Sequence, residues 1–189
     1  MIDPCSPAAF EAKYRADPDP WAFASAPAEQ QRYEAIVGLL RRERYETGYE
    51  PACSIGALTV RLAARCNELV AVDVAPTAVA RTTERCRSMP RVRVEVGSVT
   101  DRRPERFDLV VLSEVGYYFS RPALVGVVDG VVASIPPGGE LVACHWTGTS
   151  EDHVLAGATV HETIGGHPDL ELLAHDDGPT YLLASWRRR

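Results

Sequence analysis

The sequence is short of basic residues, and this shortage limits the kind of partner that it can serve. Twenty Lys and Arg stand against 26 Asp and Glu among 189 residues, which gives a net charge of −6. Binding to a nucleic-acid backbone depends on a basic face that neutralises phosphates. We therefore expect no nucleic-acid partner, and the basic run Arg187-Arg188-Arg189 is typical of a solubilising tail.

Long apolar runs and paired cysteines are also missing. The most apolar helical segment, residues 124–135, contains Asp129 and is far shorter than the roughly 20 apolar residues of a membrane span. The amino end, M-I-D-P-C-S-P, has no basic segment before an apolar stretch, so we expect no secretory signal, no membrane partner and a cytoplasmic location. The five cysteines form no C-x-x-C pair, which predicts reduced thiols and no metal site.

The length and the ordinary soluble composition predict one domain over residues 1–189. Residues 1–43 are expected to form an N-terminal arm and helix, and residues 44–189 an α/β core. The arm is rich in Pro and Ala and contains D-P-D-P-W, so we predict irregular chain with one short helix at 8–14, followed by a longer helix at 28–42. We expect this helical arm to cover part of the core as a lid.

From residue 45 onward, apolar strand patterns alternate with helical patterns. The expected strands are 45–50, 69–73, 92–96, 107–113, 140–145, 170–174 and 181–185, and the expected helices are 56–64, 76–87, 122–135 and 152–164. This alternation predicts a Rossmann-like, doubly wound α/β fold with helices on both faces of a seven-stranded mixed sheet. The polar turn H-D-D-G-P predicts that the last strand is antiparallel to its predecessor.

A small-residue turn and a later acid predict a nucleoside site. The run E-P-A-C-S-I-G, residues 50–56, follows the first strand, and Asp73 ends the second. A dinucleotide fingerprint needs a third glycine that is missing here, which disfavours a nicotinamide oxidoreductase. S-adenosylmethionine has no phosphate. Its carboxylate suits a helix amino end, Glu50 can balance its positive groups, and Asp73 can accept hydrogen bonds from the ribose. S-adenosylhomocysteine is the expected product.

These motifs resemble those of class I S-adenosylmethionine-dependent methyltransferases. The resemblance includes F-D-L-V-V-L-S-E-V at 107–115 and P-G-G-E-L at 137–141. The arm motif D-P-D-P-W, with E-P-A-C-S-I-G, E-V-G-Y-Y and H-V-L-A-G, is most similar to the nodulation protein S type, N-methyltransferases that act on amino-sugar oligosaccharides.

The turn and the resemblance together predict the cofactor-binding residues. Two departures stand out: Ala52 and Ser54 replace the usual glycines, and Ser98 replaces the acid that commonly contacts adenine, so backbone amides near Val99 or the Asp101 carboxylate are expected to read the base. Cys53 is expected to be a small filler and not a nucleophile. The expected cofactor-binding residues are Trp21, Arg32, Glu50, Ala52, Cys53, Ser54, Gly56, Asp73, Val74, Ser98, Val99 and Ser113.

The loop after the strand 107–113 is the expected acceptor side. Methyl transfer is an in-line displacement, so alignment supplies most of the acceleration and a base removes the acceptor's proton. Glu114 and His145 are the candidate bases, with Tyr118 as a third catalytic residue and Tyr117 and His153 as substrate-binding residues. His153 and His161 are expected on one helix. No acid or cysteine with ligand spacing accompanies the histidines, so a metal is not expected.

The function expected from the sequence is methyl transfer to a nitrogen of a small polar molecule, such as an amino sugar. An O-methyltransferase of a sugar or specialised metabolite is the alternative. A non-catalytic nucleoside-binding protein with a decayed site is an alternative of another class, because Ala52, Ser54 and Ser98 depart from the usual pattern. Acceptor identity is left open, because fold does not decide substrate, and the chain is expected to be a monomer or a homodimer.

Overall fold

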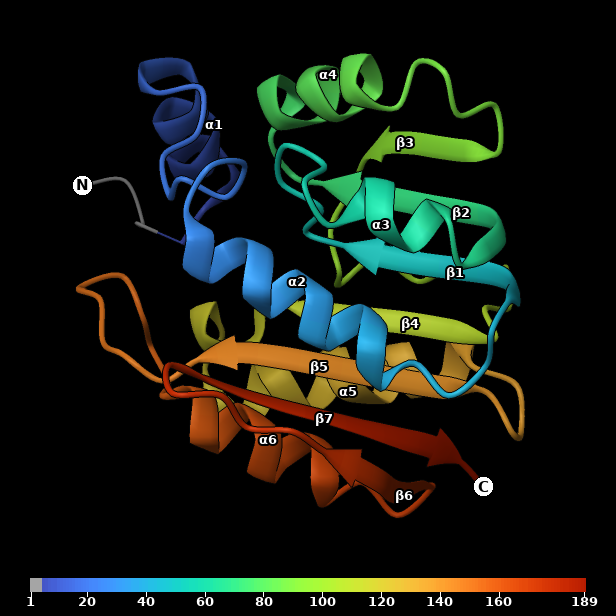
Figure 1. Cartoon of the computed structure of the whole chain (residues 1–189). Coiled ribbons are helices and arrows are strands. Elements are labelled where there is room, and N and C mark those ends of the chain that lie inside the picture. The colour runs from blue at the N-terminus through green and yellow to red at the C-terminus, as the bar shows by residue number, and fades with distance from the viewer. Residues whose placement is uncertain (1–4) are drawn as a thin grey trace.

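The structure is a computed structural model that describes residues 5–189. Figure 1 shows a central sheet with helices on both faces. The strands are β1 Tyr45–Pro51, β2 Cys66–Asp73, β3 Val92–Val96, β4 Leu109–Ser113, β5 Glu140–Trp146, β6 Leu170–His175 and β7 Tyr181–Arg188. The helices are α1 Pro7–Ala16, α2 Pro27–Leu39, α3 Thr59–Ala63, α4 Pro76–Arg85, α5 Arg121–Ser134 and α6 Gly157–Gly165, with a 3₁₀ turn η1 at Gly116–Tyr118.

The sheet has the strand order β3-β2-β1-β4-β5-β7-β6. The pairs among β1 to β5 are parallel, whereas β7 runs antiparallel to both β5 and β6. The expected seven-stranded mixed sheet and its antiparallel last strand are therefore confirmed. The strand order reverses between β1 and β4, and open α/β sheets bind ligands outside the carboxyl ends of the strands at such a point.

Successive side chains along the strands point to opposite faces of the sheet and pack into two separate hydrophobic cores. Leu109 and Val111 of β4 pack with α2 and α3 on one face, whereas Val110 and Leu112 pack with α5 and α6 on the other. In Figure 1, α2 and α3 lie in front of the sheet and α5 and α6 behind it. Both faces of the parallel strands are therefore covered, as their continuous apolar sequences require.

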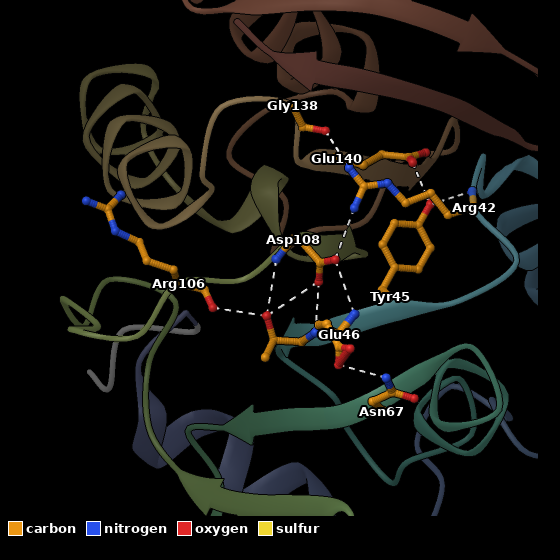
Figure 2. A network of polar contacts seen from close by, with 9 residues as sticks. Arg42, Tyr45, Glu46, Asn67, Arg106, Asp108, Gly138 and Glu140 are labelled. Atoms are coloured by element: carbon orange, nitrogen blue, oxygen red, sulfur yellow. Dashed lines mark hydrogen bonds and ion pairs between the residues drawn. The ribbon is translucent and has the colours of Figure 1, made fainter.

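A polar network fixes the amino ends of β1 and β4 (Figure 2). The Asp108 carboxylate accepts hydrogen bonds from the backbone amides of Glu46 at 3.1 Å and Thr47 at 2.8 Å, and Arg42 forms an ion pair with it at 3.1 Å. Nearby, the Tyr45 hydroxyl donates to the buried Glu140 carboxylate at 2.5 Å. These contacts lie at the amino ends of β1 and β4, at the opposite edge of the sheet from the carboxyl ends where the strand order reverses. They fix the position of β1 relative to β4 without occupying the space outside those carboxyl ends.

One expected helix is wrong at its start. The pattern predicted a helix at 152–164, but α6 begins at Gly157 and His153 lies in the loop before it. The backbone amides of Val154 and Leu155 donate to the Tyr117 carbonyl at 2.8 and 3.1 Å, so these two residues hydrogen-bond to η1 and do not begin a helix. His153 and His161 therefore do not share a helix.

Candidate functional site

The turn after β1 has an unusual backbone. Ala52, Ser54 and Gly56 all have positive φ, at 59°, 54° and 78°. Only glycine fits the last position, because a Cβ there would lie 2.8 Å from Thr82 Cγ2 and 3.2 Å from its Cα. The two non-glycine residues keep the conformation that glycine would give at a cost of about 1–2 kcal/mol each. Ala52 and Ser54 therefore hold left-handed backbone in this turn without glycine.

Asp73 at the end of β2 holds that turn. Its Oδ2 accepts a hydrogen bond from the Ser54 amide and its Oδ1 one from the Ala75 amide, both at 2.9 Å. Burial raises the pKa of this carboxyl, and the two amides and that of Val74 act in the opposite direction. A carboxylate has about four acceptor sites. Two remain for a ligand, and Asp73 lines the cavity described next.

A cavity of about 410 Å³ lies outside the carboxyl ends of β1, β2 and β4. Of the expected cofactor-binding residues, Gly56 alone does not line it, because its role is to shape the turn. The expected residues that do line it are Trp21, Arg32, Glu50, Ala52, Cys53, Ser54, Asp73, Val74, Ser98, Val99 and Ser113.

Glu50 places an unsatisfied acid in the cavity wall. Its side chain is 3% exposed, and within residues 5–189 its Oε2 has no hydrogen-bond partner. Burial raises the pKa of this carboxyl to about 8. A buried acceptor without a partner costs free energy until a donor arrives. Glu50 is therefore built to receive a cationic or hydrogen-bond-donating group of a ligand.

Arg32 of α2 and Glu114 after β4 form a buried ion pair in the same wall. Arg32 Nη1 lies 3.1 Å from Glu114 Oε1, and Nη2 pairs with Glu29. Arg32 Nε is buried and, in the described chain, has no partner. Glu114 itself has a φ of 58°, a left-handed conformation that clusters at functional sites in non-glycine residues.

Both oxygens of Glu114 are already engaged. Oε1 also accepts from the Trp146 amide at 2.7 Å, and Oε2 accepts from the Tyr117 hydroxyl at 2.6 Å. The Glu114 side chain is thus held in one position at the cavity, and its use as the base stays a prediction.

Only one of the other candidate catalytic and substrate-binding residues lines the cavity. Tyr118 lines the cavity, but Tyr117, His145 and His153 do not. Tyr117 is buried and stacks on His153, with ring centroids 3.8 Å apart. His145 is completely buried, with Nε2 accepting from the Gly116 amide at 3.0 Å. His145 therefore supports the loop and does not face the cavity that was expected to hold its substrate.

The arm supplies residues that the sequence analysis missed. Phe10 and Tyr14 of α1 line the cavity, and the Tyr14 hydroxyl donates to Ser54 Oγ at 2.7 Å. Phe10 contacts Tyr118 edge-on at 4.9 Å between ring centroids, and Tyr14 contacts Trp21 in the same way at 5.4 Å. Aromatic residues four apart share a helix face. This spacing was the available signal.

The Ser98 segment takes a tight turn at the far side of the cavity. The Ser98 amide donates to Asp101 Oδ2 at 2.7 Å, and Ser98 Oγ accepts from the Thr100 amide at 3.1 Å. Ser98, Val99 and Thr100 line the cavity, whereas Asp101 does not. The Asp101 carboxylate is therefore used to close the turn, and the backbone and hydroxyl groups of the preceding three residues are what this segment presents to the cavity.

Residues 5–189 offer neither a metal site nor a membrane-spanning helix. No group of three or more His, Cys, Asp or Glu side chains in this part of the chain is placed to hold a metal ion. None of the described helices is long and apolar enough to cross a membrane. What the cavity offers is Glu50 and Asp73 as acceptors, Arg32 as a donor and aromatic walls. This combination suits a nucleoside that carries both a cationic and a carboxylate group.

The sequence is similar to those of known proteins. The profile described as nodulation protein S (NodS) matches residues 10–155. Nodulation protein S of Sinorhizobium fredii NGR234 is 32% identical over 66% of this chain and 59% of its own length, and that of Rhizobium tropici is 33% identical over 66% and 53%. The chain thus matches only about half to three fifths of these curated relatives.

Solved structures agree with the fold. N-methyltransferase NodS from Bradyrhizobium japonicum WM9, in complex with S-adenosylhomocysteine, has a TM-score of 0.85 and 27% identity, covering 96% of this chain and 97% of its own. A putative methyltransferase from Pseudomonas syringae has a TM-score of 0.75 and 30% identity, covering 85% and 99%. The Rossmann-like fold of class I methyltransferases is therefore confirmed. Because the family profile matches most of the sequence, the chain belongs to the nodulation protein S family.

Proposed function

We propose that this protein is an S-adenosylmethionine-dependent methyltransferase that transfers a methyl group to a nitrogen of a small polar molecule. The observation that supports it most is the meeting of Glu50, Asp73 and Arg32 around one cavity at the point where the strand order reverses. The relative of known structure is an N-methyltransferase bound to S-adenosylhomocysteine, which supports both the cofactor and the nitrogen acceptor.

Each polar group of the wall has a matching part of the cofactor. Asp73 has free acceptor sites for the ribose hydroxyls, Glu50 has an unpartnered oxygen for the ammonium group, and Arg32 has an unpartnered Nε–H for the carboxylate. The unsatisfied atoms are thus the ones that this ligand would satisfy. S-adenosylmethionine, when bound, supplies a methyl group activated by its sulfonium.

The chain's own residues then align the acceptor. Tyr118 and Glu114 line the cavity beside Ser113, at the end of β4. An amine nitrogen in its neutral form would take the methyl group as the methyl–sulfur bond breaks, S-adenosylhomocysteine would leave, and the proton of the amine would pass to water. The Glu114 carboxyl group in the wall lies where it would attract the ammonium form of an amine, which a sugar hydroxyl lacks. An amino sugar is the acceptor class that we propose, and a sugar hydroxyl is the alternative.

The test combines binding with transfer. Isothermal titration with S-adenosylhomocysteine, with NAD as a control, should give micromolar binding of the former alone. The Asp73→Asn variant should weaken that binding at least ~10-fold, because an amide NH2 replaces one of the two oxygens that accept from the Ser54 and Ala75 amides and that would accept from the ribose. Asp129→Asn is the matched control, because Asp129 is 62% exposed on α5.

Transfer is then measured from radiolabelled S-adenosylmethionine to glucosamine and to glucose. Transfer to glucosamine alone supports the nitrogen acceptor, and transfer to glucose alone replaces it with the O-methyl alternative. Binding without transfer to a wider set of amines and sugars would favour the non-catalytic reading, and NAD binding alone would overturn the proposed function.

A further inference from the structure

His145 at the end of β5 has both ring nitrogens engaged inside the protein. Nε2 accepts a hydrogen bond from the Gly116 amide at 3.0 Å, and Nδ1 lies 3.3 Å from Nε2 of His161 on α6. The side chain is completely buried and does not line the cavity. A ring in this position has no free nitrogen with which to take a proton from an acceptor.

The contacts determine which nitrogen of His145 carries the proton. A backbone amide only donates, so the Nε2 that faces Gly116 must be an unprotonated acceptor. The neutral ring then has its proton on Nδ1, which donates to His161 Nε2. His161 in turn carries its own proton on Nδ1. Gly116 therefore donates to His145, and His145 donates to His161. Two neutral rings satisfy this chain of hydrogen bonds.

Gly116 has no freedom to move toward these rings. A Cβ at this position would lie 2.4 Å from Val160 Cγ1 and 3.1 Å from His145 Nε2, so β5 and α6 form a close wall against the first residue of η1. The cavity residues Glu114 and Tyr118 stand two positions before and two positions after it. The backbone position of Gly116 therefore fixes the positions of both of these side chains in the cavity wall.

We infer that His145 is a positioning residue that fixes residues 113–118, the acceptor side of the cavity, through the Gly116 amide, and that it does so only in the neutral Nδ1–H form selected by His161. The name "acceptor side" rests on the proposed function. The inference about the tautomer and the loop rests on the hydrogen bonds alone. It replaces the expected role of His145 as a base with a structural one that acts through the loop.

The surroundings favour the neutral form. His145 is faced by His161 from α6, Arg32 from α2, His153 from the preceding loop and the Tyr117 ring from η1, at 5.5 Å between centroids. Burial, and then the three basic groups, hold the pKa of His145 well below its usual range. Burial lowers the pKa of His161 to about 4, against an opposing effect of Asp177.

Protonation of either ring would break the arrangement. A proton on His145 Nε2 faces the Gly116 N–H, which sets a donor against a donor. A proton on His161 Nε2 faces His145 Nδ1–H, and the tautomer change that relieves this conflict creates the first one. Residues 113–118 should therefore keep their place at neutral pH and lose it in acid.

The first experiment reads the tautomer directly. Two-bond ¹H–¹⁵N correlation spectra of the full-length protein at pH 7 should show His145 protonated on Nδ1 and unprotonated on Nε2. Amide hydrogen exchange should show Gly116 protected at pH 7 and less protected near pH 4. An Nε2–H tautomer, or an unprotected Gly116 amide at pH 7, would overturn the inference whether or not the protein is a methyltransferase.

The second experiment separates positioning from base catalysis. His145→Gln keeps an oxygen that can accept from Gly116 but cannot act as a base, whereas His145→Leu removes the acceptor at similar size. We expect Gly116 exchange and kcat toward glucosamine to stay within ~3-fold in the Gln variant, and kcat to fall ~10-fold or more in the Leu variant with S-adenosylhomocysteine affinity within ~3-fold.

The controls distinguish a positioning role of His145 from a general effect of substitution. His175→Gln, at an exposed position of β6, should change none of these quantities. Equal loss of kcat in the Gln and Leu variants, with Gly116 still protected in the former, would assign His145 as a base and overturn the inference. Failure of the wild type to bind S-adenosylhomocysteine would overturn the proposed function instead. If the Leu variant does not fold, the wild-type spectra and the Gln variant still decide.

Discussion

Ala52 and Ser54 carry backbone strain at the edge of the cavity. Each has a left-handed conformation that costs a non-glycine residue about 1–2 kcal/mol. The surrounding contacts hold it: Asp73 Oδ2 accepts from the Ser54 amide, and the Thr82 hydroxyl donates to the Ser54 carbonyl at 2.7 Å. Loss of glycine at these places therefore affects stability more than the shape of the site.

The strain at Ala52 can be measured. Ala52→Gly should raise the free energy of unfolding by about 0.5–1 kcal/mol, because relief of the left-handed strain exceeds the extra entropy of glycine in the unfolded chain. The same change at Ala80, exposed inside α4, should lower it by about 0.5–1 kcal/mol. Urea unfolding of both variants checks the opposite signs, and a loss at both positions would contradict the strain.

Glu50 should lower the stability of the empty protein as pH rises. Its pKa of about 8 in the folded state lies above the ordinary value of 4.5, so the folded form binds the proton more tightly. The contribution of Glu50 to stability is then complete below about pH 4.5 and is lost as pH rises toward 8. At pH 8 the free energy of unfolding of Glu50→Gln, measured with urea, should therefore exceed that of wild type by on the order of 2 kcal/mol. At pH 4.5 the two should differ little.

The same variant should bind the cofactor less well. Its neutral amide cannot balance an ammonium group, so S-adenosylhomocysteine affinity should fall while stability rises. Glu34→Gln, on the exposed side of α2, is the control for general effects of charge. A gain in stability that is equal at both pH values would show that ionisation of Glu50 is not its cause.

At the scale of elements, α1 is attached to the start of α4. Glu11 Oε2 accepts from the Thr77 amide at 2.9 Å and Oε1 from its hydroxyl at 2.7 Å, which places an acid at a helix amino end. These bonds lower the pKa of Glu11. On the other side, Lys13 forms an ion pair with Asp152 at 2.5 Å. The arm is therefore tied to α4 and to the loop before α6, on both sides of the cavity.

Removal of the Glu11 attachment should loosen the arm. Because α1 carries Phe10 and Tyr14 of the cavity wall, Glu11→Ala should speed S-adenosylhomocysteine dissociation several-fold, with a smaller effect on its association. Stopped-flow fluorescence, with Trp21 in the wall as the probe, can follow this. Glu34→Ala is the matched control. An unchanged dissociation rate would mean that the remaining contacts hold α1 without Glu11.

At the scale of the whole molecule, the buried histidines predict how stability depends on acid. The pKa of His161 is about 4 in the folded protein and near 6.5 when unfolded, so the unfolded chain binds the proton first as pH falls. The contribution of His161 to stability is complete above about pH 6.5 and declines toward pH 4. Wild type should lose stability over this range, and His161→Gln should lose on the order of 1–2 kcal/mol less.

Denaturant unfolding at several pH values measures that slope. The comparison is between slopes and not absolute stabilities, because His161→Gln also changes a buried contact with His145. His175→Gln should keep the wild-type slope, since His175 is exposed. A slope in His161→Gln that equals the wild-type slope would place the acid sensitivity elsewhere.

Several expectations for the molecule as a whole stay predictions. They are the division into an arm at 1–43 and a core at 44–189, the monomer or homodimer and the cytoplasmic location. Residues 1–4 of the arm also lie outside the described part of the chain. The lid role of the remaining arm is supported by Phe10, Tyr14 and Trp21 in the cavity wall, and the dissociation experiment tests it.

The sequence by itself determined the sheet, the family and most of the polar residues of the cavity wall. Those features are local: strand and helix periodicity, a turn of small residues and an acid at a strand end depend on neighbours along the chain, so Glu50 and Asp73 could be identified without coordinates. Only the tertiary structure decided the role of His145 and the start of α6. A ring nitrogen that meets Gly116 and loop amides that meet the Tyr117 carbonyl are contacts between distant segments, and periodicity carries no information on such contacts.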